Sequence, residues 1–483
     1  MNHNDKQTAD FLKSASSTAR EITDAASTDE AIYVLSHLDA DGLAAAGIIG
    51  KALHRLDARF RIRITQWIDQ KIIEEISSEK PQMTILTDLG SGSIDVLKEN
   101  LKDFHIAVLD HHQINSRNNG DFVHLNPHIY NIDGTRDISG SGVAYFTAKA
   151  IDKINVDLAP IALVGALGDM QDKYDQRKLG GLNEIIVEDA VNTGLLTIEK
   201  DLTFFGRETR PIHRTLASTT SPFIPGISGE EDKSLAFLVN LGIQPKQGER
   251  WRALRDLSED EKKKLCSALA DHLLSKGLHC EVTNLIGHIY VLNREESWTP
   301  LRDAREFSVL LNATGRMNRP SLGVAVCMGE RGSSLDEANR VLEDYRRAIA
   351  KYLGWIIEEP KRMDELESIY VVHGGTSVED KMVGAISSIL SLTLPNPRKP
   401  LIMYANVEED GVAKFSARTL DKVTEKGVNL GEILSLAAEK CLGRGGGHSV
   451  AAGAQVPIEN INAFVTLVDE LVGKQLKREK NES

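Results

Sequence analysis

Aspartate and histidine residues follow each of four apolar segments in the first 170 residues of the chain. The apolar segments are residues 31–36, 82–87, 104–109 and 158–168. The residues that follow them are His37, Asp39, Asp41, Asp88, Asp110, His111, His112 and Asp169. We interpret the segments as parallel strands, whose carboxyl ends lie along one edge of a sheet, where ligands bind. The sequence therefore predicts that five carboxylates and up to three imidazoles gather at one place.

Such a concentration of carboxylates predicts a site for divalent cations. Carboxylates that are removed from water repel one another, and one or two bound cations remove that repulsion. Oxygen and imidazole ligands suit Mn²⁺, with Mg²⁺ or Co²⁺ as possible substitutes, and no cysteine lies near these residues in the sequence. A pair of cations about 3.5–4 Å apart is a known device for hydrolysing phosphate esters. A single aspartate at a strand end is more often a helix cap or turn residue, an alternative that applies to Asp88 taken alone.

Alternating strand and helix patterns surround these residues and predict an α/β fold, with a parallel sheet covered by helices on both faces. A further strand is predicted over residues 59–67, and helices over 1–29, 42–56, 92–101 and 139–152. Residues 171–300 are more polar, and we interpret them as an inserted, mostly helical module. A strand over 321–329 and a long connector helix over 335–359 are predicted next. From residue 368 onward, strand and helix patterns predict a second, smaller α/β domain.

Two features of the C-terminal part could bind phosphate. Lys414, Ser416 and Arg418 alternate along a predicted strand and share one face, which is either a phosphate-binding face or a solvated edge. Arg418 is the strongest candidate, because a guanidinium binds phosphate through two parallel hydrogen bonds. The segment 443–454, GRGGGHSVAAGA, is either a plain glycine-rich turn or a flexible loop that brings backbone N–H groups and His448 to a phosphate.

The overall composition limits the class of protein. The net charge of −13 argues against non-specific binding of nucleic acid, although a local basic face remains compatible with a nuclease. The four cysteines form no CxxC pair, which favours reduced thiols over a zinc ribbon or a disulfide framework. The polar N-terminus and the lack of a long apolar run predict a cytoplasmic protein without a membrane span.

Taken together, these motifs resemble those of the DHH phosphoesterase superfamily, which is named after the triplet found here as Asp110-His111-His112. The four acidic motifs are SHLDADG, LTDLGSG, VLDHH and ALGDMQD, and the resemblance covers nearly the whole chain. Within the superfamily, the chain is similar to the archaeal RecJ-like single-strand exonucleases, including the GINS-associated nuclease type. The C-terminal GGGH segment resembles the motif of the DHHA1 domain, the substrate-binding partner of the catalytic domain.

The resemblance implies roles for the candidate residues. The ligands of two Mn²⁺ ions would be Asp39, Asp41, Asp88, His111 and Asp169, with Asp88 as the bridging ligand. Asp110 would orient a neighbouring histidine, and His112 would lie close to the scissile phosphate. The residues that bind substrate phosphates would be Lys414, Ser416, Arg418, Gly446, Gly447, His448 and Arg316, the last of these in a predicted glycine-containing turn.

The role of His37 stays open at this point. In many superfamily members the histidine of the first motif lies four residues before the first aspartate, whereas His37 lies two residues before Asp39. Residues 37, 39 and 41 nevertheless face the same side of an extended strand, which would allow His37 to be a metal ligand.

The resemblance also implies a domain organisation and a function. The predicted parts are a catalytic domain over 1–200, a possible partner-binding insertion over 201–300, a return to the catalytic domain over 301–334, a connector over 335–364 and a DHHA1 domain over 365–483. The predicted function is a Mn²⁺-dependent, single-strand-specific exonuclease that degrades DNA or RNA to mononucleotides in replication or repair. One alternative is a phosphodiesterase of short oligoribonucleotides or cyclic dinucleotides. Another is a scaffold subunit that binds the GINS complex, because eukaryotic replication helicases contain a relative of this family that has lost its catalysis.

Overall fold

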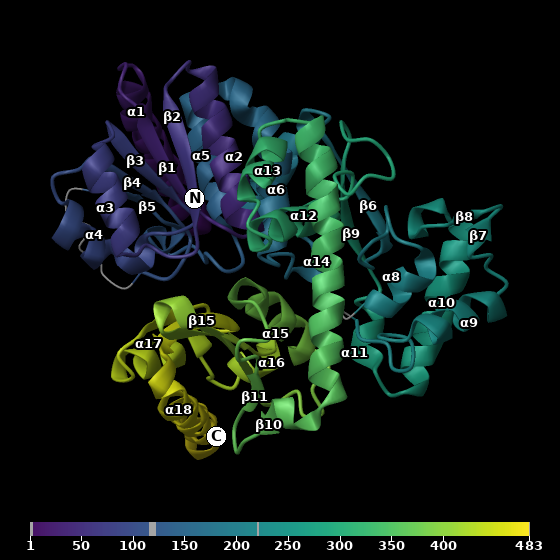
Figure 1. The fold of residues 1–483 in the computed structure, drawn as a ribbon. Helices are drawn as coiled ribbons and strands as arrows, with labels where there is room; N and C mark the ends of the chain where they lie inside the picture. Colours follow the sequence, from purple (N-terminus) through teal and green to yellow (C-terminus); the bar gives the residue numbers. More distant parts are fainter. Residues whose placement is uncertain (1–2, 115–121, 220–221, 483) are drawn as a thin grey trace. The chain divides into compact units, whose positions relative to one another are not determined.

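The computed structural model describes residues 3–114, 122–219 and 222–482 of the chain (Figure 1). The chain folds into two compact units, residues 1–342 and 343–483. Among the helices of the described residues, none combines the length and the apolar composition that a membrane span requires. Cys266, Cys327 and Cys441 are free thiols, and the side chain of Cys280 lies outside the described part.

The first unit is built on a parallel sheet, as the alternation of strand and helix patterns predicts. The sheet has five strands, and the one over residues 123–125 was not predicted. The strand order is β2-β1-β3-β4-β5, with bounds β1 Ile32–His37, β2 Phe60–Thr65, β3 Met83–Thr87, β4 Ile106–Leu109 and β5 Val123–Leu125. Strands β3 and β4 are buried along their length and β1 is buried from Ile32 to Ser36, because helices cover both faces of a parallel sheet.

Helices cover both faces of this sheet (Figure 1). The helices of the first 192 residues are α1 His3–Ala26, α2 Ala40–Arg55, α3 Gln70–Glu79, α4 Ile94–Leu101, α5 Gly140–Ile151, α6 Ala159–Gly168 and α7 Leu182–Asn192. Apolar residues of α3 and α4 pack with one face of β1, β3 and β4 in a common core cluster. Helices α2 and α5 pack against the strands and against each other, and α6 lies on α2 and α5. The helices therefore hold the strand ends at fixed positions.

The insertion is mostly helical, as predicted, and has a core of its own. It contains α8 Ile212–Ser218, α9 Glu231–Asn240, the short strands β7 Lys246–Gln247 and β8 Arg250–Trp251, α10 Glu259–Ser275 and α11 His279–Val282. Ser258 caps α10 through a capping box with Glu261, as its sequence suggests. An antiparallel pair, β6 Leu196–Leu202 and β9 Ile286–Leu292, brackets the insertion. The sequence pattern did not predict this pair, whose strands lie far apart in the chain.

Three helices follow the insertion: α12 Ala304–Arg316, α13 Pro320–Cys327 and α14 Ser333–Glu358. The long helix over 335–359 is confirmed as α14, but the predicted strand over 321–329 is wrong, because those residues form most of α13. Pro320 stands in the first turn of α13, where the missing N–H costs nothing. The predicted turn around Arg316 is likewise shorter than expected, since Arg316 is the last residue of α12.

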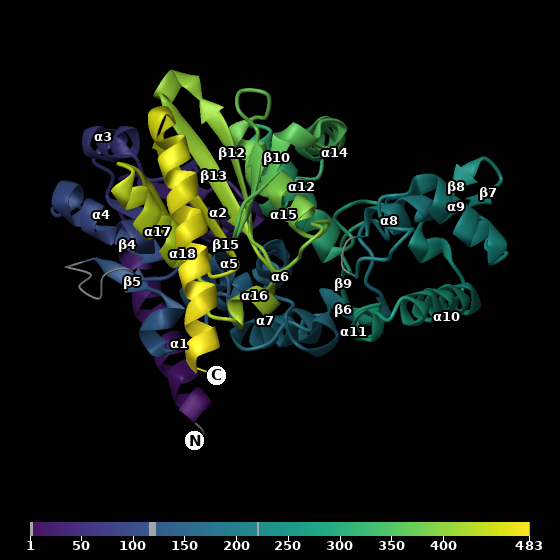
Figure 2. The same ribbon diagram turned by 90° about the horizontal axis from the view of Figure 1, so that it is seen from below.

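The second unit contains a mixed six-stranded sheet of order β10-β11-β12-β13-β15-β14. The strands are β10 Met363–Glu365, β11 Tyr370–His373, β12 Leu401–Val407, β13 Val412–Arg418, β14 Arg444–Gly447 and β15 Ala451–Pro457. The helices are α15 Val383–Ser391, α16 Asp421–Thr424, α17 Leu430–Lys440 and α18 Ile461–Glu482. Helices α17 and α18 lie along one face of the sheet (Figure 2). Their apolar residues form a core with that face. Helix α15 packs on β12 and β13.

Candidate metal centre

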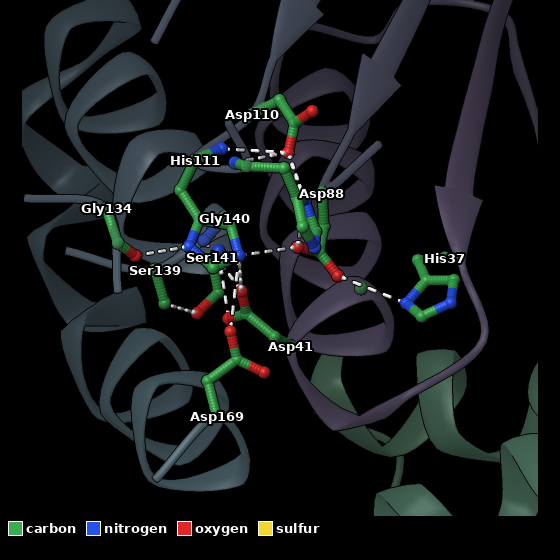
Figure 3. A network of polar contacts seen from close by, with 12 residues as sticks. His37, Asp41, Asp88, Asp110, His111, Gly134, Ser139, Gly140, Ser141 and Asp169 are labelled. Atoms are coloured by element: carbon green, nitrogen blue, oxygen red, sulfur yellow. Dashed lines mark hydrogen bonds and ion pairs between the residues drawn. The ribbon is translucent and has the colours of Figure 1, made fainter. Parts of the chain in front are cut away.

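Most of the candidate ligands lie at the carboxyl edge of the parallel sheet (Figure 3). His37 is the last residue of β1, and Asp39 is the N-cap of α2, where its side chain accepts a hydrogen bond from Gly42 N–H at 3.1 Å. Asp88 directly follows β3, and Asp110 directly follows β4. The parallel topology therefore brings together side chains that are far apart in sequence, as the strand-end argument predicts.

Asp169 reaches the site from a helix, so the interpretation of residues 158–170 as a fourth strand is wrong. These residues form α6, which is buried from Ala159 to Leu167, with Asp169 as its C-cap. A buried helix and a buried strand can share the same apolar sequence pattern, and periodicity alone does not separate them. Pro160 in the first turn of α6 fits a helix start. The predicted position of Asp169 beside the other carboxylates nevertheless holds, since its Oδ2 lies 3.2 Å from His111 Nε2.

The site consists of two groups of side chains that meet at Asp88. Each group offers ligand atoms that all lie within 4.8 Å of one another: the first is His37, Asp39 and Asp88, and the second is Asp41, His111 and Asp169. Asp88 Oδ2 faces the first group, 3.6 Å from His37 Nδ1, while Asp88 Oδ1 faces the second, 3.2 Å from His111 Nε2. Each carboxylate oxygen of Asp88 is thus directed at a different group, which is the arrangement that a bridging ligand requires.

His111 is held in one orientation by the protein backbone. Its Nδ1 lies 2.6 Å from the carbonyl oxygen of Gly134, which can only accept a hydrogen bond, so Nδ1 carries the proton. The lone pair of Nε2 is then directed toward Asp88 and Asp169 (Figure 3). This is the tautomer that a metal-ligating histidine needs.

Asp110 and His112 form a separate pair beside the two groups. Asp110 Oδ1 accepts hydrogen bonds from His112 Nδ1 (2.8 Å) and from the backbone N–H of His111 (2.8 Å), and its Oδ2 accepts one from Ser91 N–H (2.9 Å). Burial raises the pKa of the Asp110 carboxyl, but His112 and these donors outweigh it and hold that pKa well below its usual range. Asp110 is therefore an anion that orients His112, whose side chain is one-third exposed.

Asp41 accepts two hydrogen bonds from the start of α5. Its Oδ2 accepts from Gly140 N–H at 2.6 Å and its Oδ1 from Ser141 N–H at 3.0 Å. These amides lie at the positive end of the α5 macrodipole. Burial, followed by the charges of Asp88 and Asp169, nevertheless raises the pKa of Asp41 well above its usual range.

These electrostatics fit a pair of divalent cations. Neither carboxylate oxygen of Asp88 accepts a well-formed hydrogen bond from the described residues, although both are buried. Burial, with the charges of Asp39 and Asp88, also raises the pKa of Asp169. A cluster of buried carboxylates is costly unless positive charge compensates it. The donors are carboxylate oxygens and imidazole nitrogens, which suit Mn²⁺. The residues of the two groups could therefore hold this ion.

Close backbone approach shapes the pocket around these ligands. A Cβ atom at Gly140 would lie 2.7 Å from Asp88 Oδ1, and one at Gly165 would lie 2.4 Å from Asp41 Oδ1. Asp88 itself has a φ of +57°, a left-handed conformation that aspartate tolerates better than most residues. The turn after β3 therefore directs the carboxylate into the site.

Comparison with known proteins identifies three domains in the chain. Residues 31–166 match the DHH family N-terminal domain, residues 204–286 match the DHH-CID domain and residues 368–474 match the DHHA1 domain. The uncharacterized protein MJ0831 of Methanocaldococcus jannaschii is 33% identical over 455 residues, which cover 92% of this chain and 94% of that protein. The chain belongs to the DHH family.

Solved structures share the fold at low sequence identity. CDC45 from Entamoeba histolytica matches with a TM-score of 0.64 and 12% identity, covering 96% of this chain and 99% of that one. RecJ in complex with Mn²⁺ from Thermus thermophilus matches with a TM-score of 0.58 and 17% identity, covering 96% of this chain. The chain spans 55% of the length of that RecJ chain.

The candidate phosphate-binding residues of the DHHA1 domain share one face of β13. Lys414 Nζ lies 2.6 Å from Asp380 Oδ2, Ser416 Oγ lies 2.9 Å from Ser387 Oγ, and Arg418 Nε donates to Ser388 Oγ at 2.8 Å. These contacts place all three side chains on the side of α15. Strand β13 lies between β12 and β15, so the alternative of a solvated edge is wrong.

The glycine-rich segment is more ordered than predicted. Gly446 and Gly447 belong to β14, which pairs with β15, and His448 begins the turn between them. The His448 N–H donates to Ala451 O at 2.8 Å, which closes that turn. The prediction of a flexible loop is therefore wrong, because successive glycines here form a paired edge strand.

Helix α12 and the start of α5 add further residues to the site, and of these the sequence singled out only Arg316. Burial raises the pKa of Asp39, but His37 outweighs it and lowers that pKa, and Arg316 at the end of α12 adds to the lowering. Asn312 on the same helix accepts a hydrogen bond from Ala40 N–H at 3.1 Å and was not singled out. The Ser139-Gly140 start of α5 is a helix-cap pattern that could have indicated an anion-binding helix end.

Proposed function

We propose that this DHH-family protein is a Mn²⁺-dependent, single-strand-specific exonuclease that hydrolyses phosphodiester bonds of DNA or RNA to mononucleotides. The single observation that carries the proposal is Asp88, whose two carboxylate oxygens face two groups of oxygen and imidazole donors. Two bound cations would supply a nucleophilic water at neutral pH and neutralise charge on the phosphoryl oxygens. Mg²⁺ or Co²⁺ could substitute for Mn²⁺.

The residues of the site would have two roles, metal binding and proton donation. The proposed ligands are Asp39, Asp41, Asp88, His111, Asp169 and His37, whose Nδ1 lies 3.0 Å from Asp39 Oδ2. His112 would hold a proton at Nε2 and donate it toward the scissile phosphate or the leaving oxygen. Burial lowers the pKa of His112, but the Asp110 carboxylate outweighs it and raises that pKa above its ordinary value. The contact with Asp110 therefore favours the protonated form of His112.

The DHHA1 domain would hold the strand through its phosphates. Lys414, Ser416 and Arg418 share a face. The β14–β15 hairpin would offer the backbone of Gly446 and Gly447 from β14 and the side chain of His448 from the turn. Contacts of this kind read the phosphate backbone and give little sequence preference. The predicted boundaries of the catalytic domain, the insertion, the connector and the DHHA1 domain are part of this proposal. Arg316 would be a further phosphate contact.

The test is digestion of end-labelled strands of about 20 nucleotides, as DNA and as RNA, with Mn²⁺ and with EDTA. The wild-type protein should release mononucleotides only with the metal. Asp88→Asn keeps the side-chain volume and should lower the rate at least about 1,000-fold, because cation binding supplies several kcal/mol to such reactions. Asp157→Asn is the matched control: Asp157 pairs with Arg55 at 2.7 Å, and the variant should keep the wild-type rate. Cleavage by Asp88→Asn at the wild-type rate would refute the proposal.

Two alternatives give different outcomes in the same assay. A phosphodiesterase of short oligoribonucleotides or cyclic dinucleotides would cleave dinucleotides faster than strands of about 20 nucleotides. A scaffold subunit, suggested by the fold that the chain shares with CDC45, would cleave neither and would bind a GINS complex. Binding of GINS by Asp88→Asn, together with nuclease activity of the wild type, would show that both functions coexist.

A further inference from the structure

Gln171 lies behind the second ligand group and was not assigned any role by the sequence. Helix α6 ends in a Schellman turn, in which Met170 N–H donates to Leu167 O at 3.2 Å and Gln171 N–H donates to Ala166 O at 3.0 Å. Met170 takes the left-handed position of this turn with a φ of +55°. The turn separates the two neighbours of Met170: Asp169 joins the ligands, and the Gln171 side chain is fully buried.

The Gln171 side chain joins the supports of two different ligands. Its Nε2 donates to Gly134 O at 3.0 Å, the same carbonyl that accepts a hydrogen bond from His111 Nδ1. The same Nε2 donates to Ile138 O at 3.1 Å, directly before Ser139, the N-cap of α5.

The second of these contacts leads to Asp41, because the first amides of α5 are its hydrogen-bond donors. Asn183 Nδ2 donates to Gln171 Oε1 at 2.8 Å, and this bond fixes which end of the Gln171 amide faces the two carbonyls. The buried Gln171 amide therefore supports His111 through Gly134 and Asp41 through the start of α5. Asp169 precedes Gln171 by two residues in the same turn. The first group, with His37 and Asp39, receives none of these hydrogen bonds among the described residues.

We propose that Gln171 is a positioning residue that sets the metal affinity of the second group alone. The inference rests on the metal centre of the proposed function. Removal of the two donors takes this support from the carbonyls of Gly134 and Ile138. His111 and Asp41 then lose their fixed orientation, and loss of such a supporting contact typically lowers metal affinity 10- to 100-fold.

The experiment measures Mn²⁺ binding to the full chain by equilibrium dialysis and by the EPR signal of free Mn²⁺. Gln171→Met removes both donors at similar volume, and we expect one of two Mn²⁺ sites to weaken 10- to 100-fold while the other keeps its affinity. In an Asp39→Asn background, which disables the first group, Gln171→Met should still weaken the remaining site. In an Asp41→Asn background it should have no further effect.

The control is Asn155→Leu. Asn155 is also a fully buried amide with two hydrogen bonds, to Ala148 O at 2.8 Å and from Arg55 at 2.7 Å, but it lies beyond the far end of α5. It should lower the melting temperature and leave both Mn²⁺ affinities unchanged. Asn183→Leu serves as a milder variant should Gln171→Met fail to fold, and it should weaken the same site by less.

The outcomes separate the two proposals. Wild-type Mn²⁺ affinities in Gln171→Met, or an equal loss in Asn155→Leu, would overturn the role of Gln171 and leave the metal centre standing. Wild-type protein that binds no Mn²⁺ would overturn the proposed function and, with it, this inference. A Mn²⁺ titration needs no nucleic acid substrate, so a failure of nuclease activity alone does not affect the result.

Discussion

Replacement of Asp169 by asparagine should stabilise the metal-free protein and remove part of its response to Mn²⁺. Asp41 and Asp169 offer oxygen atoms within 4.8 Å of each other, and at an effective dielectric constant of about 20 their repulsion is about 3.5 kcal/mol. Asp169 also places a negative charge at the C-terminal end of α6, which costs about 0.5 kcal/mol. The contact of Asp169 with His111 at 3.2 Å offsets about 2 kcal/mol of this. We therefore expect Asp169→Asn to gain about 2 kcal/mol without metal.

Saturating Mn²⁺ should reverse that order. A cation at 100 times its dissociation constant stabilises the folded protein by about 2.7 kcal/mol per site, and Asp169→Asn would lose one site. Scanning calorimetry in EDTA and in Mn²⁺ measures both effects, and a gain of about 2 kcal/mol corresponds to a shift of roughly 3 °C in a unit of this size. Asp157→Asn, which breaks the pair with Arg55, should melt lower in both buffers. The reasoning fails if Asp169→Asn melts below wild type in EDTA and keeps the full Mn²⁺ shift.

Three further predictions concern single contacts. The Arg252 side chain lowers the pKa of Glu261 to about 2, so their pair stabilises the fold fully above about pH 4.5 and loses this effect as the pH falls through 2. Urea unfolding should show that Glu261→Gln is about 1 kcal/mol less stable at pH 7 and that the difference shrinks below pH 4.5. Met170→Gly keeps the left-handed conformation but removes the steric cost of a Cβ in it, and should raise stability by about 1 kcal/mol in EDTA, measured by urea unfolding. Gly165→Ala places a Cβ 2.4 Å from Asp41 Oδ1 and should lower kcat/KM for single strands about 100-fold.

The sequence predicts the site better than it predicts the elements that carry it. A parallel sheet has a single carboxyl edge, so residues after β1, β3 and β4 must meet whatever the loops between them do. Asp169 joined the same cluster although its segment is helix α6 rather than a strand. Asp169 stands at the end of a buried apolar segment whether that segment is a strand or a helix, and this position was enough to predict its place. The strand predicted over 321–329 is wrong for the same reason, since a short apolar run fits both a strand and a helix such as α13.

Long-range pairing accounts for most of what the sequence did not predict. Strands β6 and β9 pair across the whole insertion, and the partner of each is invisible in local periodicity. The glycines of β14 have no strand propensity of their own and are ordered by their hydrogen bonds to β15. Gln171 has an ordinary polar side chain, and only the folded chain shows that Gly134 and Ile138 lie beside it.

Other buried carboxylates of the same unit differ from the candidate metal ligands, because they form ion pairs with arginine or lysine. Asp201 contacts Arg207 and Lys262, and Asp172 contacts Arg305, so each of these buried or half-buried acids has a permanent cationic partner.

In the ion pairs of the described residues, Asp41, Asp88 and Asp169 contact only histidines. Their other supports are neutral: the backbone amides of α5 and, through His111, the carbonyl of Gly134. The fold thus orients these ligands without neutralising their charge by arginine or lysine. A bound divalent cation could supply the missing positive charge, as the proposed function requires.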